Sequence, residues 1–135
     1  MLKLNEIEID TLLEALDDEY MAWATYDRVI SDFGEVRPFI NIRDAEARHI
    51  QALCSLLISY GIPVPENTWP GRVAQYKTLH EACEAGIAAE IKNGQMYQRL
   101  LATTDKEDIL AVLRNLQWAS QQRHLAAFQR CVERR

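Results

Sequence analysis

The chain has 135 residues and a formal net charge of −5 at pH 7. Its content of 48% hydrophobic and 26% charged residues is ordinary for a globular protein, so we expect a single domain over 1–135. An acidic chain without a basic stripe is not typical of a nucleic-acid-binding protein. No apolar run reaches the roughly 18 residues of a membrane span, and acidic residues stand where a signal peptide would be apolar. We therefore expect a cytoplasmic protein whose partners are neither nucleic acid nor membrane.

The cysteines are three in number, far apart, and contain no C-x-x-C pair. An odd count at such spacing argues against a disulfide framework and against a structural zinc site. We interpret Cys54, Cys83 and Cys131 as small buried hydrophobic residues.

A first helix is predicted over 11–33, beginning with a capping box at Thr11. One face of this helix carries residues spaced three and four apart, which is the period of a buried helical stripe. The stripe consists of Leu12, Leu16, Glu19, Trp23, Tyr26, Ile30 and Phe33. Glu19 is its only carboxylate. The neighbouring Asp18 is expected to point outward into solvent.

A second helix is predicted over 38–60, after the turn at Gly34. Its stripe repeats the same spacing and consists of Phe39, Ile42, Glu46, His49, Leu53, Leu56 and Tyr60. Glu46 and His49 are ionisable residues within an apolar face, where an unpaired charge costs several kcal/mol. Glu-x-x-His on the inner face of a bundle helix is also the arrangement of carboxylate-bridged two-metal sites.

The segment 61–71 contains three prolines, which exclude a regular element and favour an extended chain. Eleven extended residues reach about 36 Å, whereas a helix of some 22 residues is about 33 Å long. The segment is therefore long enough to run the length of a helical bundle. We predict a long crossover between helices 2 and 3 rather than a short turn.

Two further helices are predicted over 72–103 and 105–133, the second from a capping box at Thr104. The inner residues of the third helix are Tyr76, Leu79, Cys83, Gly86, Glu90, Asn93, Tyr97 and Leu100. Those of the fourth are Leu110, Leu113, Gln117, Gln121, His124, Phe128 and Cys131, with two successive intervals of four around Gln117. Because no segment alternates with the period of a strand, we predict an all-α fold.

The two halves of the chain repeat the same arrangement of inner polar residues. Glu19, Tyr26, Glu46 and His49 in the first half correspond to Glu90, Tyr97, Gln121 and His124 in the second. Each tyrosine follows its glutamate by seven residues. Packed about a pseudo-twofold axis, the four helices would bring these groups into one interior layer. We interpret the tyrosines as core aromatics whose matched offsets suggest that they support the layer.

The chain resembles the ferritin-like di-iron carboxylate superfamily, which includes rubrerythrins and bacterioferritins. The resemblance rests on Phe39-Ile-Asn-Ile-x-x-Ala-Glu46-x-x-His49, Leu56-Leu-x-x-Tyr60-Gly-Ile, Ala119-Ser120 and His124-Leu-x-Ala-Phe128. These phrases are most similar to a bacterial ferritin-like domain family of unknown function, over 11–128. The resemblance implies a ferritin-like four-helix bundle with a long crossover. It also implies two iron ions, with manganese or a single metal as alternatives, held by Glu19, Glu46, His49, Glu90 and His124.

Gln121 stands where the superfamily usually has the sixth ligand, a glutamate. A neutral amide bridges two hard cations poorly, so the half-site near His124 is expected to be the weaker one. The resemblance implies oxidation of Fe(II) with dioxygen or peroxide. The alternative is a degenerate bundle without metal, acting as a structural or protein-interaction module. The sequence does not decide whether the protein is an enzyme, and it leaves open a homo-oligomer such as a dimer.

Overall fold

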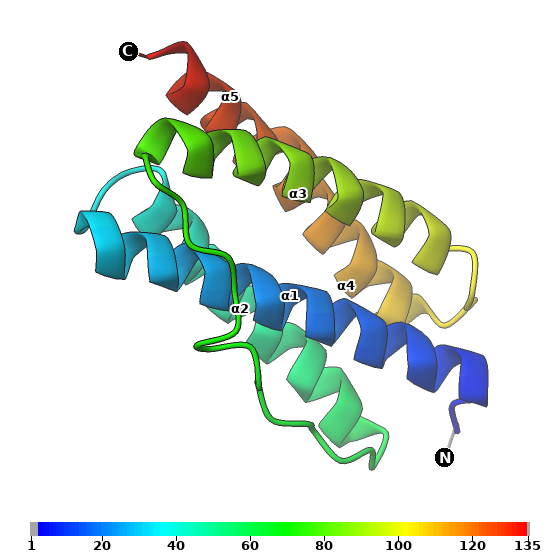
Figure 1. Ribbon diagram of the computed structural model, residues 1–135. Coiled ribbons are helices and arrows are strands. Elements are labelled where there is room, and N and C mark those ends of the chain that lie inside the picture. The colour runs from blue at the N-terminus through cyan, green and yellow to red at the C-terminus, as the bar shows by residue number, and fades with distance from the viewer. Residues whose placement is uncertain (1–2, 135) are drawn as a thin grey trace.

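The computed structural model describes residues 3–134. The helices are α1 (Glu6–Phe33), α2 (Phe39–Ser59), α3 (Leu79–Leu100), α4 (Glu107–Trp118), the π-helical segment η1 (Ala119–His124) and α5 (Leu125–Glu133). Because α4, η1 and α5 follow one another without interruption, the chain forms four helical rods (Figure 1). No strand occurs in the described range, so the all-α prediction is confirmed. None of its helices is long and apolar enough to cross a membrane.

α1 begins at Glu6, before the predicted start at Thr11. The side chain of Asn5 accepts a hydrogen bond of 2.8 Å from the backbone amide of Glu8, whose carboxylate accepts one of 3.0 Å from the amide of Asn5. This reciprocal pair is a capping box whose cap residue, Asn5, lies six residues before the expected Thr11. Thr11 is instead buried inside α1, and its hydroxyl lies 2.7 Å from that of Thr103.

The predicted starts of the third and fourth helices are also wrong. α3 begins at Leu79 and not at Arg72, because the side chain of Thr78 accepts a hydrogen bond from an amide of the first turn. α4 begins at Glu107 without a capping side chain. The hydroxyl of Thr104, predicted as its cap, donates to Glu8 on α1 and so ties the start of α4 to the start of α1.

The connection from α2 to α3 covers 61–78 and passes across α1 on its way to the start of α3 (Figure 1). The hydroxyl of Tyr20 on α1 donates a hydrogen bond of 2.7 Å to the carbonyl of Pro65. The indole nitrogen of Trp69 donates one of 3.0 Å to the carboxylate of Asp17. These bonds attach an irregular segment to the outer side of α1.

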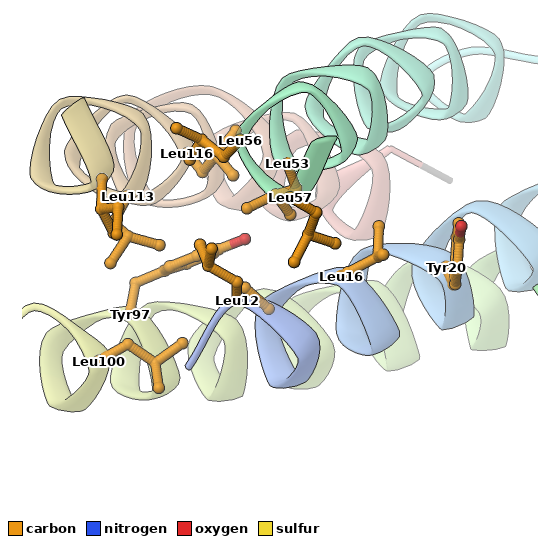
Figure 2. Packing of buried hydrophobic residues seen from close by; sticks show 12 residues of the cluster. Leu12, Leu16, Tyr20, Leu53, Leu56, Leu57, Tyr97, Leu100, Leu113 and Leu116 are labelled. Carbon is orange, nitrogen blue, oxygen red and sulfur yellow. The ribbon is translucent and has the colours of Figure 1, made fainter. Parts of the chain in front are cut away.

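The interior consists of two apolar clusters that are separated along the rods. The first contains leucines from all four rods around Tyr97, as Figure 2 shows. The second contains the mutually packed rings of Tyr26, Phe39 and Phe128, whose centroids lie 5.3–5.9 Å apart. Near the junction of the two clusters every rod carries a buried polar side chain, and these are Glu19, Glu46, Glu90, Ser120 and His124. The clusters thus enclose a polar layer.

A disulfide joins Cys83 on α3 to Cys131 on α5, with 6.1 Å between their Cα atoms. The interpretation of these two cysteines as unlinked hydrophobic residues is therefore wrong. Their separation of 48 residues gave no local signal, because only the packing of α3 against α5 brings them together. Cys54 is a free thiol, as expected.

Candidate metal centre

Five of the six residues predicted as metal ligands meet in the polar layer. They are Glu19 from α1, Glu46 and His49 from α2, Glu90 from α3 and His124 from the end of η1. The three glutamates are each 2–3% exposed, and His124 is 4% exposed. The helical spacing of each stripe places these side chains inward, with an apolar cluster on either side of them.

The five side chains form two triads that share Glu46. In the first, Nδ1 of His49 lies 3.5 Å from Oε2 of Glu19 and 3.6 Å from Oε2 of Glu46. In the second, Nδ1 of His124 lies 3.1 Å from Oε1 of Glu46 and 3.4 Å from Oε1 of Glu90. The two oxygens of Glu46 therefore face different triads. The two imidazole rings stack with 5.7 Å between their centroids.

Three buried polar atoms of the triads lack a hydrogen-bond partner: Oε2 of Glu19, Oε2 of Glu46 and Nδ1 of His124. The 3.1 Å contact of His124 with Glu46 is an ion-pair distance without hydrogen-bond alignment. Buried polar atoms are rarely left unsatisfied, so three of them in adjoining triads indicate a missing partner. A divalent cation binds carboxylate oxygen and imidazole nitrogen. The residues present therefore fit a metal ion.

Two tyrosines hold the outer glutamates in place. The hydroxyl of Tyr97 on α3 donates a hydrogen bond of 2.5 Å to Oε1 of Glu19 on α1. The hydroxyl of Tyr26 on α1 donates one of 3.1 Å to Oε1 of Glu90 on α3. Burial, followed by the negative charge of nearby carboxylates, raises the pKa of both phenols well above the ordinary value, so both stay protonated donors. Each of the two helices thus supplies a tyrosine to the glutamate of the other, as the repeat of Glu and Tyr in the two halves of the sequence suggests.

Gln121 is the predicted ligand that the structure does not bring into either triad. Its amide nitrogen donates hydrogen bonds of 2.7 Å to the backbone carbonyl of Glu90 and 3.0 Å to the hydroxyl of Ser120. The inner position belongs to Ser120, which is 2% exposed and donates to Oε2 of Glu90. The reason is the π-helical turn at 119–124, whose wider winding shifts the register. The two successive intervals of four around Gln117 were its signal in the sequence.

Asp18 belongs to the surroundings of the centre, and the expectation that it points into solvent is wrong. Its carboxylate accepts a hydrogen bond of 2.6 Å from the side-chain amide of Asn93 on α3. Burial raises the pKa of Asp18 to about 6, and the charges of Glu46 and Glu90 add to that rise against the opposing effect of the hydrogen bond from Asn93. A buried helical face is at least about 100° wide, so a stripe drawn through Glu19 alone was too narrow to include Asp18.

The charges inside the layer are strongly coupled. Burial alone would raise the pKa of Glu46, but contacts with His124 and His49 outweigh burial and hold this pKa below its ordinary value. Burial alone would lower the pKa of His124, whereas Glu46 and Glu90 raise it to about 9. In the protein without metal, the Glu46 carboxylate is therefore paired with a protonated His124.

The layer is reached from two sides. A cavity of about 330 Å³ between α1 and α3 is lined by Asp18, Glu46, Glu90 and Asn93 among others. A groove of about 540 Å³ between α2 and the last rod reaches His124. The first opening is acidic and the second contains arginines, so the two sides of the layer differ in charge.

Fold and site together define an all-α protein with buried glutamate and histidine groups that could hold a metal ion. Residues 8–135 match the family described as the uncharacterized protein domain DUF2202, and the chain belongs to that family. The chain is also similar to the crystal structure of a hypothetical protein from Methanococcus jannaschii, with a TM-score of 0.86 and 25% identity over 98% of this chain and 83% of that one. No curated protein matches. Since neither description names an activity, the function must be argued from the site.

Proposed function

We propose that the chain is a single-domain ferritin-like bundle, with 61–78 as its long crossover and a two-metal carboxylate centre in the polar layer. The observation that carries this proposal is the position of Glu46, whose two oxygens each belong to a different triad. A carboxylate shared in this way can bridge two cations. A carboxylate that served a single histidine would not need to face two triads.

Each remaining ligand then belongs to one ion. Glu19 and His49 hold the first, and Glu90 and His124 hold the second. Glu19 keeps one oxygen free of hydrogen bonds, whereas both oxygens of Glu90 accept one, from Tyr26 and Ser120. Glu90 has less electron density left to offer, and Gln121 adds no charge. The half-site at His124 is therefore the weaker of the two.

Iron is the metal we propose, with manganese as the alternative, because both accept mixed carboxylate and imidazole ligands. A bound pair of iron ions would supply the redox chemistry for oxidising Fe(II) with dioxygen or peroxide. The chain itself supplies the acidic cavity between α1 and α3, through which a cation can approach Glu46 and Glu90. It also supplies a largely buried layer between two apolar clusters, where charges interact more strongly than in water.

The test is the metal stoichiometry of the protein after removal of all metal. Titration with Fe(II) under nitrogen, followed by calorimetry and elemental analysis, should give two ions per chain with unequal affinities. Glu46→Gln should abolish binding of both ions, because it removes the shared charge. Glu84→Gln is the matched control, since Glu84 is 57% exposed on the outside of α3. This variant should bind as the wild type does.

A bundle without metal, acting as a structural or interaction module, is the second candidate. It is favoured by Glu90, both of whose oxygens are satisfied by hydrogen bonds within the chain, and by the ion pair between Glu46 and His124. If neither Fe(II) nor Mn(II) binds saturably to the wild type, this second candidate replaces the metal centre.

A further inference from the structure

A groove between α2 and the residues 122–134 gathers positive charge on an acidic protein. The arginine groove, as we call it, has a volume of about 540 Å³ and is lined by Arg37, Arg48, Arg123, Arg130 and Arg134. These five account for a third of the fifteen Lys and Arg residues in a chain whose net charge is −5. None of the described residues that line the groove is acidic. The local charge is thus opposite to that of the whole chain.

Among the residues that the structure describes, the arginines of the groove have no acidic partner, a property that they share with Arg72 and Arg114 outside the groove. Arg28, Arg43 and Arg99 each form a salt bridge with an aspartate or glutamate. Within residues 3–134, none of the five groove arginines forms one. Guanidinium groups stay charged at every physiological pH. The guanidinium of Arg123 lies 5.4 Å from the centroid of the Trp118 ring, and that of Arg134 donates to the carbonyl of Arg130, but neither contact neutralises a charge. Five positive charges without an acidic partner in the described range therefore give the groove a positive potential.

Helical spacing brings the arginines onto facing sides of the groove. On the last rod, Arg123 lies in η1 and Arg130 lies seven residues later on α5, while Arg134 follows directly after the end of α5; all three line the groove. On α2, Arg48 lies one helical turn after the lining residue Ala45. α2 packs directly against α4, and the groove occupies the space beside η1 and α5. The positive walls therefore come from two elements far apart in the sequence.

We propose that the arginine groove binds a small polyvalent oxyanion, a molecule with two or more phosphate or carboxylate groups. Guanidinium forks bind such groups through paired, charge-assisted hydrogen bonds. The volume lies within the range of about 300–1,000 Å³ that is typical of small-molecule sites. A nucleic acid fits less well, because the groove is local and the rest of the chain is acidic. Since His124 lines both the groove and the polar layer, the bound anion lies beside the candidate metal centre.

Calorimetric titration of the metal-free protein with pyrophosphate tests this proposal. Metal is removed on an immobilised chelating resin, because a soluble chelator is itself a polyvalent anion. We expect one pyrophosphate per chain, with an affinity that falls as salt is added. Arg48→Gln and Arg130→Gln, on opposite walls, should each weaken binding about tenfold or more. Inorganic phosphate, which offers a single group, should bind more weakly than pyrophosphate by a similar factor.

The matched control is Arg114→Gln, an exposed arginine of α4 outside the groove. This variant should bind pyrophosphate as the wild type does. Unsaturable binding, or an equal loss in the control, would overturn the proposal. Tighter binding of a short single-stranded RNA, lost in the same groove variants, would overturn it in favour of a nucleic-acid surface. Because no metal is present, failure here leaves the two-metal proposal untouched.

Discussion

Tyr97 on α3 donates a hydrogen bond of 2.5 Å to Glu19 on α1, inside the polar layer. Tyr26 and Glu90 make the same contact in the opposite direction between the same two helices. Each tyrosine also belongs to one of the two apolar clusters. The tyrosines therefore couple the packing of the core to the position of the carboxylates.

Tyr97→Phe should lower the free energy of unfolding of the metal-free protein by about 1–3 kcal/mol, the usual cost of leaving a buried polar group unsatisfied. The ring stays and only the donor to Glu19 disappears, so packing is preserved. Urea unfolding followed by circular dichroism measures the change. Tyr60→Phe is the control, because its hydroxyl bonds to Asp108 at the surface and its loss should cost much less. Equal losses in both variants would show that the buried bond to Glu19 contributes no more to the free energy of unfolding than the surface bond of Tyr60.

The rods and the polar layer could be predicted because they depend on local periodicity. Residues three and four apart share a helical face in any bundle, so Glu19, Glu46, His49, Glu90 and His124 were identified without knowledge of the packing. The repeat between the two halves then indicated that they would meet. Helix ends were less predictable, because Thr11 and Asn5 are both good caps and only the fold selects between them.

Two of the three features that the sequence did not predict depend on tertiary contacts, and the third depends on an irregular helical turn. Cys83 and Cys131 are joined because α3 and α5 pack together. Gln121 was assigned to the layer by assuming one regular helix, and the π-helical turn gives that place to Ser120. Asp18 was missed because its partner Asn93 lies on another helix. The cysteine pair and Asp18 thus required knowledge of a second helix, whereas the π-helical turn left a trace in its own helix, the two intervals of four around Gln117.

The stability of the metal-free protein should fall as the pH rises from about 6.5 to about 9. The pKa of His124 is raised from 6.5 to about 9 by Glu46 and Glu90 against the effect of burial. A raised pKa contributes stability that is fully present below the unfolded value and is lost as the pH rises through the folded value. The shift corresponds to roughly 3 kcal/mol. Thermal unfolding across this pH range measures the loss.

Glu46→Gln provides the comparison for this pH dependence, because it removes one of the two carboxylates that raise the pKa of His124. The variant should be less stable at pH 6 and should show a flatter decline toward pH 9. His80→Gln should keep the decline of the wild type, since His80 is exposed and lies outside the layer. If stability falls as steeply with pH in Glu46→Gln as in the wild type, the pH dependence comes from groups other than the pair of Glu46 and His124.

Reduction of the Cys83–Cys131 disulfide should destabilise the protein by up to about 4 kcal/mol. The bond closes a loop of 48 residues, and its main effect is to restrict the unfolded chain. Urea unfolding with and without a phosphine reductant measures the difference. Cys131→Ala should resemble the reduced wild type and should not respond to the reductant. Cys54→Ser, which leaves the disulfide intact, should respond as the wild type does.

Gln121→Glu distinguishes the ligand set of the sequence prediction from the one that the structure favours. If Gln121 faced the metals, a glutamate would add a charged ligand and strengthen metal binding. In the structure the amide of Gln121 donates to the carbonyl of Glu90. The side chain of Gln121 also packs against Gly94, so closely that a Cβ atom at position 94 would lie 2.2 Å from its amide nitrogen. A carboxylate at that place cannot donate and would face a carbonyl oxygen.

We therefore expect Gln121→Glu to lose about 1–3 kcal/mol of stability and to bind no more metal than the wild type. Gln51→Glu is the control, because it makes the same change of charge at an exposed position of α2 that lines neither the polar layer nor the arginine groove. It should leave stability nearly unchanged. Urea unfolding measures the first effect, and Fe(II) titration under nitrogen measures the second. A higher metal stoichiometry or tighter binding in Gln121→Glu would show that this side chain turns into the layer when metal binds, as the sequence prediction requires.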